Sequence, residues 1–371
     1  MPFSPFSARL DAVRSLLEQL SVDALIVNHG VNIRYLSGFV GSAGLLVVDR
    51  RDLVLIVDGR YDFVARRGVE AGTLAAMAVE RVERRYPKTL VELLTARGIR
   101  KVAFEAEHTT VAVLDEWRRM APAVDWRPSQ QVVERLRIKK DAGEIAVLRR
   151  AGQLISDVAA RLPEWVSAGR TERAIAEDIE RGLLAAGFSA PAFPTIVASG
   201  PNSAFPHARP GERALERGDL VVLDFGGVLD GYCADLTRMA AVGQVGAEAR
   251  KLYEAVAEAH QAALAAVRPG IPGSVIDGAA RDRLEARGLG PAFLHATGHG
   301  LGLEVHEAPR IARADPDAPA LDVTTETGMV FTIEPGAYVD GLGGVRLEDD
   351  VLVTARGSEV LTSAPCDLVV V

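Results

Sequence analysis

The sequence predicts a two-part chain: a mixed α/β region over the first third and an α+β region over the remainder. Three observations support this prediction. The chain has 371 residues, more than one ordinary hydrophobic core holds. Short apolar runs alternate with helical patterns up to about residue 130. Beyond that point, long amphipathic helices alternate with long apolar strands.

The first third contains one clear helical stripe, formed by the apolar residues Leu10, Val13, Leu17 and Leu20. A second helix is expected over 89–100, closed by Gly98. Short apolar runs bounded by polar turns are expected to form strands at 23–28, at 101–106 and, as a pair, within 44–59.

A long amphipathic helix is expected to begin after Asp141, a candidate N-cap, so the domain boundary falls near 130–140. We therefore divide the chain into domains over 1–133 and 134–371. The second domain is expected to contain helices over 171–186, 246–267 and 273–287, and strands over 219–228, 232–241, 328–334 and 344–354.

The composition limits the function classes. A formal net charge of −8 argues against nucleic-acid binding. Two basic clusters are interpreted as solvated helix faces: Arg81, Arg84 and Arg85, and Arg135, Arg137, Lys139 and Lys140. With two cysteines far apart in the sequence, a disulfide framework is not expected and a reducing, cytoplasmic location is predicted. We expect no membrane span, because no run of about 18 apolar residues occurs.

Two aspartates lie in a predicted hairpin, LVVLDFGGVLDGYCADLTR (220–238), around the turn Asp230-Gly231. With a two-residue turn, Asp224 faces Thr237, and both project from the same side of the sheet as Asp235. Carboxylates so placed repel one another unless protons or cations compensate. Aspartates on a solvated face are the alternative, but the strands are otherwise apolar, which favours bound cations.

A second acidic pair follows near the C-terminus. Glu334 ends an apolar strand before Pro335-Gly336, and Glu348 shares a strand face with Arg346, two residues before it. Taken alone, Glu348 with Arg346 would be interpreted as a surface ion pair, and Glu334 as a residue beside a turn. Together with the hairpin aspartates they indicate a shared site.

Three histidines occur in HATGHGLGLEVHE (295–307), among three glycines. A zinc-protease helix would need a second histidine where Arg310 stands, and Pro309 would interrupt that helix. No serine nucleophile motif occurs. Four carboxylates and one histidine would balance about two divalent cations. Oxygen-rich ligation favours Mn²⁺, with Co²⁺, Zn²⁺ or Fe²⁺ as alternatives, and metal-assisted hydrolysis as the reaction class.

These motifs resemble the creatinase/prolidase/methionine-aminopeptidase family. The resemblance implies an α+β pita-bread catalytic domain, a pseudo-symmetric curved antiparallel sheet covered by helices, with two metals held by Asp, Asp, His, Glu and Glu in chain order. The matching residues are Asp224, Asp235, His299, Glu334 and Glu348. In that family pattern Asp235 and Glu348 bridge the metals, Asp224 chelates one, and His299 with Glu334 completes the other. Residues 32–61 resemble the creatinase-type N-terminal α/β domain.

The same resemblance assigns roles around the metals. It implies that His207, in SGPNSAFPHARPG (199–211), contacts substrate and carries protons together with Glu334, and that His306 binds the scissile carbonyl. His295 would line the proline subsite. Arg346, with Thr237, would orient the ligand carboxylates. Gly298 and Gly300 are expected to let the backbone approach the site closely.

We therefore predict an Xaa-Pro aminopeptidase that acts on short peptides with proline at the second position. A strict Xaa-Pro dipeptidase is the nearest alternative, and a relative without peptidase activity is a remote one. A dipeptidase would capture the free carboxylate with a basic side chain, for which the candidates are Arg34, Arg60, Arg209 and Arg310. The resemblance also suggests a homodimer.

Overall fold

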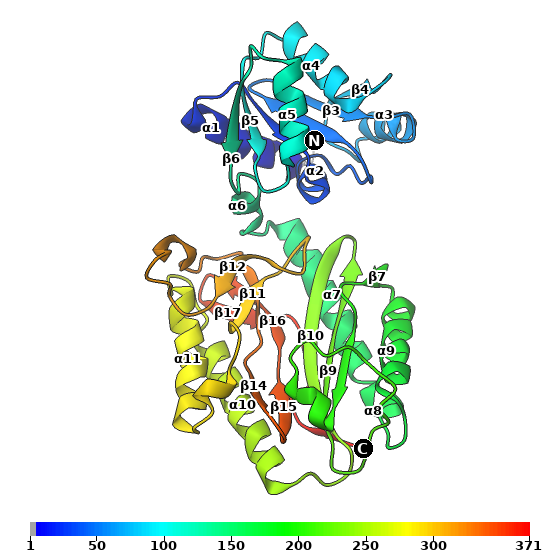
Figure 1. Ribbon diagram of the computed structural model, residues 1–371, viewed down its shortest axis with the longest axis vertical. Coiled ribbons are helices and arrows are strands. Elements are labelled where there is room, and N and C mark those ends of the chain that lie inside the picture. Colours follow the sequence, from blue (N-terminus) through cyan, green and yellow to red (C-terminus); the bar gives the residue numbers. More distant parts are fainter. Residues whose placement is uncertain (1–4) are drawn as a thin grey trace. The chain divides into compact units, whose positions relative to one another are not determined.

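The computed structural model describes residues 5–371 (Figure 1). Its contacts divide the chain into a unit that ends at Arg137 and a unit from Ile138 to Val371. In the described part of the chain, no helix is both long enough and apolar enough to cross a membrane.

The first unit is built on one mixed sheet with strand order β4-β3-β2-β1-β5-β6. β1, β2 and β3 pair antiparallel, whereas β4, β5 and β6 each join a parallel neighbour. β1 and β3 are buried along their whole length, as their unbroken apolar sequences predict. The strands are β1 (Ala24–Val27), β2 (Leu45–Asp49), β3 (Leu53–Val57), β4 (Ala78–Arg81), β5 (Lys101–Glu105) and β6 (Asp125–Ser129).

The helices of this unit are α1 (Pro5–Leu20), α2 (Gly30–Ser37), α3 (Asp62–Glu70), α4 (Tyr86–Ala96), α5 (Val111–Met120) and α6 (Glu134–Arg137). Leu10, Val13 and Leu17 of the predicted stripe are buried, whereas Leu20 at the helix end is exposed. The helix expected over 89–100 begins three residues earlier, because Pro87 occupies its first turn, where a missing N–H costs nothing.

The predicted hairpin forms the centre of the second unit. β9 (Leu220–Leu229) and β10 (Tyr232–Ala241) pair antiparallel, and Asp224 faces Thr237 as the two-residue turn requires. Asp230 and Gly231 both have positive φ, 47° and 79°, which is the geometry of a type I′ turn. β7 (Ala190–Pro191), β8 (Ile196–Ser199) and β18 (Val369–Val370) complete this sheet.

A second sheet has the strand order β12-β11-β13-β16-β17, and β14 and β15 form a separate ribbon. The strand expected over 344–354 is interrupted at Leu347 and Glu348, so it forms β15 and β16 instead of one strand. The strands are β11 (Gly298–Gly300), β12 (Glu307–Ile311), β13 (Val330–Ile333), β14 (Gly336–Val339), β15 (Gly343–Arg346), β16 (Asp349–Thr354) and β17 (Gly357–Val360).

Helices cover the sheets of this unit on two sides, with α10 and α11 on one side and α9 on the other (Figure 1). Asp141 caps α7 by accepting hydrogen bonds from the N–H groups of Gly143 (2.8 Å) and Glu144 (2.9 Å), as predicted. The helices are α7 (Ala142–Ala159), α8 (Leu162–Trp165), α9 (Glu172–Ala186), α10 (Ala247–Ala266) and α11 (Gly273–Ala286), with short 3₁₀ turns η1 (Gly200–Ala204), η2 (Gly290–Ala292) and η3 (Pro319–Leu321).

The two faces of the hairpin belong to two different cores. Val221 and Leu223 pack in the core that contains residues of α7 and α9. Leu220 and Val222 pack in the core that contains residues of α10, α11 and the second sheet. Because side chains alternate along a strand, Asp224 projects on the side of Leu220 and Val222, toward the second sheet.

The interpretation of the second basic cluster as a solvated helix face is wrong for two of its residues. Arg137 and Lys140 are 2% and 5% exposed. Arg137 donates a 2.8 Å hydrogen bond to Oδ1 of Asn32, and Nζ of Lys140 lies 2.7 Å from Oε1 of Glu307. Their carboxylate and amide partners are distant in sequence, so composition alone could not reveal the pairing.

Candidate metal centre

The predicted site residues gather around one cavity of about 710 Å³ in the second unit. Thr237 is the exception, because it is fully buried behind the cavity wall. The predicted residues that line the cavity are His207, Asp224, Asp235, His295, His299, His306, Glu334, Arg346 and Glu348.

The metal-ligand candidates come from both sheets. Asp224 and Asp235 stand on the hairpin, His299 on β11, Glu334 directly after β13, and Glu348 directly before β16. Nε2 of His299 lies 3.4 Å from Oε1 of Glu334 and 4.0 Å from Oδ2 of Asp235. One ligand atom each from Asp235, His299 and Glu348 lies within 4.8 Å of the others. The fold thus brings together side chains up to 124 positions apart in the sequence.

The ring of His299 is oriented by its own backbone. Nδ1 lies 3.1 Å from the carbonyl oxygen of Gly300, and since a carbonyl oxygen only accepts, Nδ1 carries the proton. Burial lowers the pKa of His299, so the ring is neutral at pH 7. The lone pair is therefore on Nε2, the nitrogen that faces the carboxylates.

The carboxylates cannot all be ionised without compensation. Burial, followed by repulsion from Glu348 and Asp224, raises the pKa of Asp235 well above its usual value. Burial and the neighbouring Glu334 and Asp224 likewise raise the pKa of Glu348. Burial raises the pKa of Glu334 to about 7. This mutual repulsion is the electrostatic signature of a site that accepts cations.

Divalent cations fit these donors. Oδ1 of Asp224 and Oδ1 of Asp235 are buried and have no hydrogen-bond partner among residues 5–371. Buried carboxylate oxygens are normally satisfied, and a metal ion satisfies them as acceptors while cancelling their charge. Arg346, which pairs with Asp224, supplies one positive charge beside the four carboxylates, so about three negative charges remain for one or two divalent ions to compensate.

Arg346 also connects the ligands to the proline-subsite candidate. Nη1 of Arg346 donates to the hydroxyl of Tyr338 at 2.6 Å, and that hydroxyl lies 2.9 Å from Nε2 of His295. Nδ1 of His295 donates to the carbonyl oxygen of Ala296, and burial lowers the pKa of His295 to about 4. The hydroxyl of Tyr338 therefore donates to the neutral ring of His295.

Sequence reasoning missed Tyr338. The β14–β15 pairing places Tyr338 opposite Gly344 and Gly336 opposite Arg346, so Tyr338 and Arg346 are diagonal neighbours on one ribbon. The turn pair Asp340-Gly341 was the available sign of a hairpin that would bring the two residues together. Asp350 was missed as well: its Oδ2 accepts the backbone N–H of Asp235 at 3.1 Å.

The packing of the second sheet gives a further reason for the glycines on either side of His299. A Cβ on Gly298 would lie 1.8 Å from the carbonyl oxygen of Thr332, and one on Gly300 would lie 2.2 Å from that of Ala308. These contacts are with neighbouring backbone in the second sheet and not with the ligands. Glycine is required there because β11 lies too close to its neighbours for any side chain.

Of the four arginines considered for carboxylate capture, Arg209 and Arg310 line the cavity. Both are exposed, and neither forms an ion pair with another described residue. Arg34 and Arg60 belong to the first unit, where Arg60 pairs with Asp58 at 2.8 Å.

Three buried carboxylates, the half-buried Glu334 and a neutral, oriented histidine around a cavity define a metallohydrolase. The comparisons with known proteins agree. The model of metallopeptidase family M24 matches residues 146–355, and that of the creatinase/prolidase N-terminal domain matches residues 9–139. The chain therefore belongs to metallopeptidase family M24, which confirms the family resemblance and the two-part fold. Membership implies divalent metal ions and peptide substrates.

Individual relatives span the whole chain. The Xaa-Pro dipeptidase of Pyrococcus furiosus is 32% identical over 97% of this chain and 99% of its own. A solved Xaa-Pro dipeptidase from Bacillus anthracis has a TM-score of 0.92 at 31% identity, covering 99% of this chain and 100% of its own. An X-Pro aminopeptidase from Thermotoga maritima has a TM-score of 0.86 at 31% identity, covering 95% and 99%.

Proposed function

We propose that this chain hydrolyses the bond between an N-terminal residue and a following proline, with two divalent ions held by Asp224, Asp235, His299, Glu334 and Glu348. The convergence of Asp235, His299 and Glu348 within 4.8 Å at the cavity carries the proposal. Similarity to Xaa-Pro dipeptidases and an X-Pro aminopeptidase supports the substrate class. Mn²⁺ is the proposed metal, because four of the five donors are carboxylates.

When bound, the ions activate a water molecule as nucleophile and polarise the scissile carbonyl. The protein's own residues hold the ligands in place for this reaction. Arg346 fixes Asp224, and the hydroxyl of Thr237 donates to Oε2 of Glu348 at 2.6 Å while it accepts from Nε of Arg346 at 3.2 Å. These contacts leave the carboxylates of Asp224 and Glu348 little rotational freedom.

We assign the proton transfers of the reaction to Glu334 and His207. Its place at the cavity lets Glu334 accept a proton from the attacking water and return one to the leaving prolyl nitrogen. His207 lines the same cavity and assists. His306 packs against His299, with ring centroids 4.1 Å apart, and lines the cavity, where it donates to the developing oxyanion.

The part of the cavity wall around His295 suits a proline at the second position of the substrate. His295, held by Tyr338, presents a neutral ring to the cavity, and Pro206, Ile196 and Val305 add apolar surface. The bond before proline is a tertiary amide without an N–H, so recognition depends on shape and on the carbonyl. We assign the proline ring to the side of His295.

Arg209 and Arg310 favour a second candidate, the strict dipeptidase. A substrate that ends at proline presents a free carboxylate, and an exposed arginine at the cavity binds it in bidentate fashion. A longer peptide has no carboxylate at that position and needs open space instead. The aminopeptidase and the dipeptidase thus differ in one interaction, which kinetics can measure.

The decisive experiment compares Xaa-Pro with Xaa-Pro-Yaa substrates in Mn²⁺ and in Co²⁺. An aminopeptidase cleaves both lengths, whereas a dipeptidase cleaves only the shorter. A metal-loaded preparation that cleaves neither would contradict the proposed function. We also propose a homodimer, which light scattering of the purified chain tests.

A further inference from the structure

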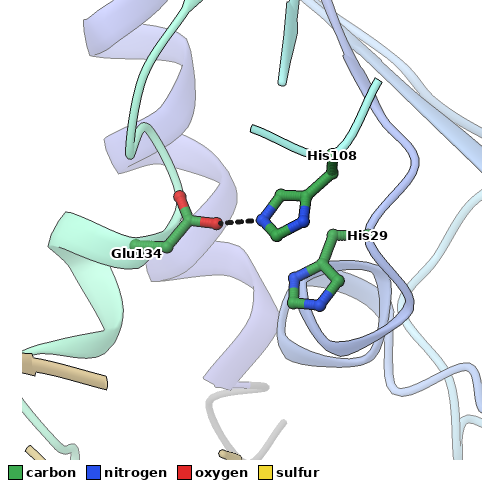
Figure 2. A group of neighbouring side chains, drawn as sticks. All are labelled: His29, His108 and Glu134. Carbon is green, nitrogen blue, oxygen red and sulfur yellow. Dashed lines mark ion pairs between the residues drawn. The ribbon is translucent and has the colours of Figure 1, made fainter. Parts of the chain in front are cut away.

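Two histidines and a glutamate come together in the first unit, far in sequence from the M24 centre: His29, His108 and Glu134 (Figure 2). His29 directly precedes α2, His108 follows β5, and Glu134 is the first residue of α6. One ligand atom from each lies within 4.8 Å of the others, and all three side chains are half-buried. We propose that these residues form a Zn²⁺ site distinct from the catalytic metals.

The donor set suits zinc. Two imidazoles and one carboxylate, completed by water, are a common ligand set of Zn²⁺ sites with three protein ligands. Nε2 of His108 lies 3.4 Å from Oε1 of Glu134. The rings of His29 and His108 stack with centroids 3.8 Å apart and planes 7° from parallel. The three side chains therefore already lie together before any ion binds.

A hydrogen-bonded frame holds both histidines by their backbones. The buried carboxylate of Glu105 accepts from the backbone N–H groups of Asn28 (2.7 Å) and His29 (2.8 Å). The side chain of Asn28 in turn donates to the carbonyl oxygen of His108 at 2.9 Å. The two histidines are therefore attached to a single rigid support, which reduces the entropy lost when they bind an ion.

Glu134 is prepared as an anionic ligand. Burial opposes its ionisation, but a hydrogen bond from Asn32 and the charges of Arg137 and His108 lower its pKa below the usual value. Nδ2 of Asn32 donates both to Oε1 of Glu134 (2.5 Å) and to Oε1 of Glu105 (2.6 Å), so Glu134 joins the same frame. Such carboxylate and amide partners commonly orient metal ligands.

Zinc binding requires one rearrangement. Zn–N bonds of about 2.0–2.1 Å place tetrahedral ligand atoms about 3.3 Å apart, closer than the 4.8 Å limit that encloses the three groups. The lone pairs of the parallel rings lie in their own planes and cannot point at one ion, so a ring must rotate out of the stack. Zn²⁺ would then connect the start of α2, the segment after β5 and α6.

The test counts metal in the full-length protein. The chain is first loaded with Mn²⁺ to fill the catalytic centre and is then dialysed against micromolar Zn²⁺ with Mn²⁺ in excess, and total metal per chain is measured by atomic emission. The wild type should hold one equivalent more than His108→Gln or Glu134→Gln. Glu107→Gln removes an exposed carboxylate beside His108 and is the matched control, which should keep the extra equivalent.

Three further readouts separate a metal site from a structural cluster. In Mn²⁺-loaded protein, added Zn²⁺ should raise the melting temperature of the control more than that of Glu134→Gln, as circular dichroism measures. Hydrolysis of Xaa-Pro by Mn²⁺-loaded Glu134→Gln should match the wild type. Zn²⁺ affinity of the extra site should fall at least about 10-fold in either ligand variant. Equal metal content in the wild type and both ligand variants would overturn the proposal.

Discussion

The hydroxyl of Thr237 donates a 2.6 Å hydrogen bond to Oε2 of Glu348, a residue 111 positions later in the chain. Thr237 is on the hairpin of one sheet, and Glu348 directly precedes a strand of the other. One hydroxyl therefore fixes a candidate ligand from the second sheet against the first. The first prediction concerns this contact.

Replacing Thr237 by Val removes the hydrogen bond and keeps the shape of the side chain. Metal affinity or activity should fall about 10- to 100-fold, because Glu348 loses its orientation. Activity titrated against Mn²⁺ measures both quantities. Thr237→Ser retains the hydroxyl and should stay close to the wild type. Equal losses in the two variants would show that packing, and not the hydrogen bond, matters.

Asp235→Asn and Glu348→Gln should each lose bound metal and nearly all activity, because both remove an anionic donor from the centre of the cluster. His306→Ala should instead keep its metal and lose rate, since it lies beyond the candidate ligands. Metal analysis beside kinetics separates the two classes. Full retention of metal by Asp235→Asn would rule out its proposed role as a ligand.

Arg310→Met tests the capture of a free carboxylate. If the chain is a dipeptidase, the KM for Xaa-Pro should rise about 10-fold or more while that for the corresponding prolyl amide changes little. Arg313→Met is the control, because Arg313 is exposed, pairs with Glu285 and does not line the cavity. An unchanged KM for Xaa-Pro would indicate that Arg209 binds the free carboxylate instead, or that the chain is an aminopeptidase.

His295 should make stability depend on pH. Its folded pKa of about 4 is below its unfolded value of about 6.5, so between these values the unfolded chain binds more protons and stability falls as pH falls. The loss from pH 7 to pH 5 should be about 2 kcal/mol. Urea unfolding at both pH values should show a smaller loss for His295→Asn than for the wild type, and identical losses would contradict the assignment.

Lys140→Met should destabilise the fold by about 3 kcal/mol, because it leaves the buried carboxylate of Glu307 without its cation. The double variant Lys140→Met/Glu307→Gln should recover much of that loss. Lys139 forms an exposed pair with Glu326, so Lys139→Met should cost less than about 1 kcal/mol. Urea unfolding of the three variants provides the comparison.

Local rules predicted the hairpin in detail. The turn Asp230-Gly231 fixes the register, and the register fixes the side on which Asp224, Asp235 and Thr237 project. The cap of α7 by Asp141 was likewise readable, because capping depends on residues within one turn. The break at Leu347 and Glu348 was not, since the backbone there bonds to Pro335 and Thr237 on other elements.

The sequence by itself determined the two-part fold, the family, and a set of chemically suitable ligands, because these follow from short-range patterns and from the residue types that metals require. Tertiary structure alone decided which of these side chains meet. Contacts such as Tyr338 with His295, Lys140 with Glu307 and His29 with His108 join residues from separate elements. Their partners are chosen by the packing of sheets and helices, which no local spacing encodes.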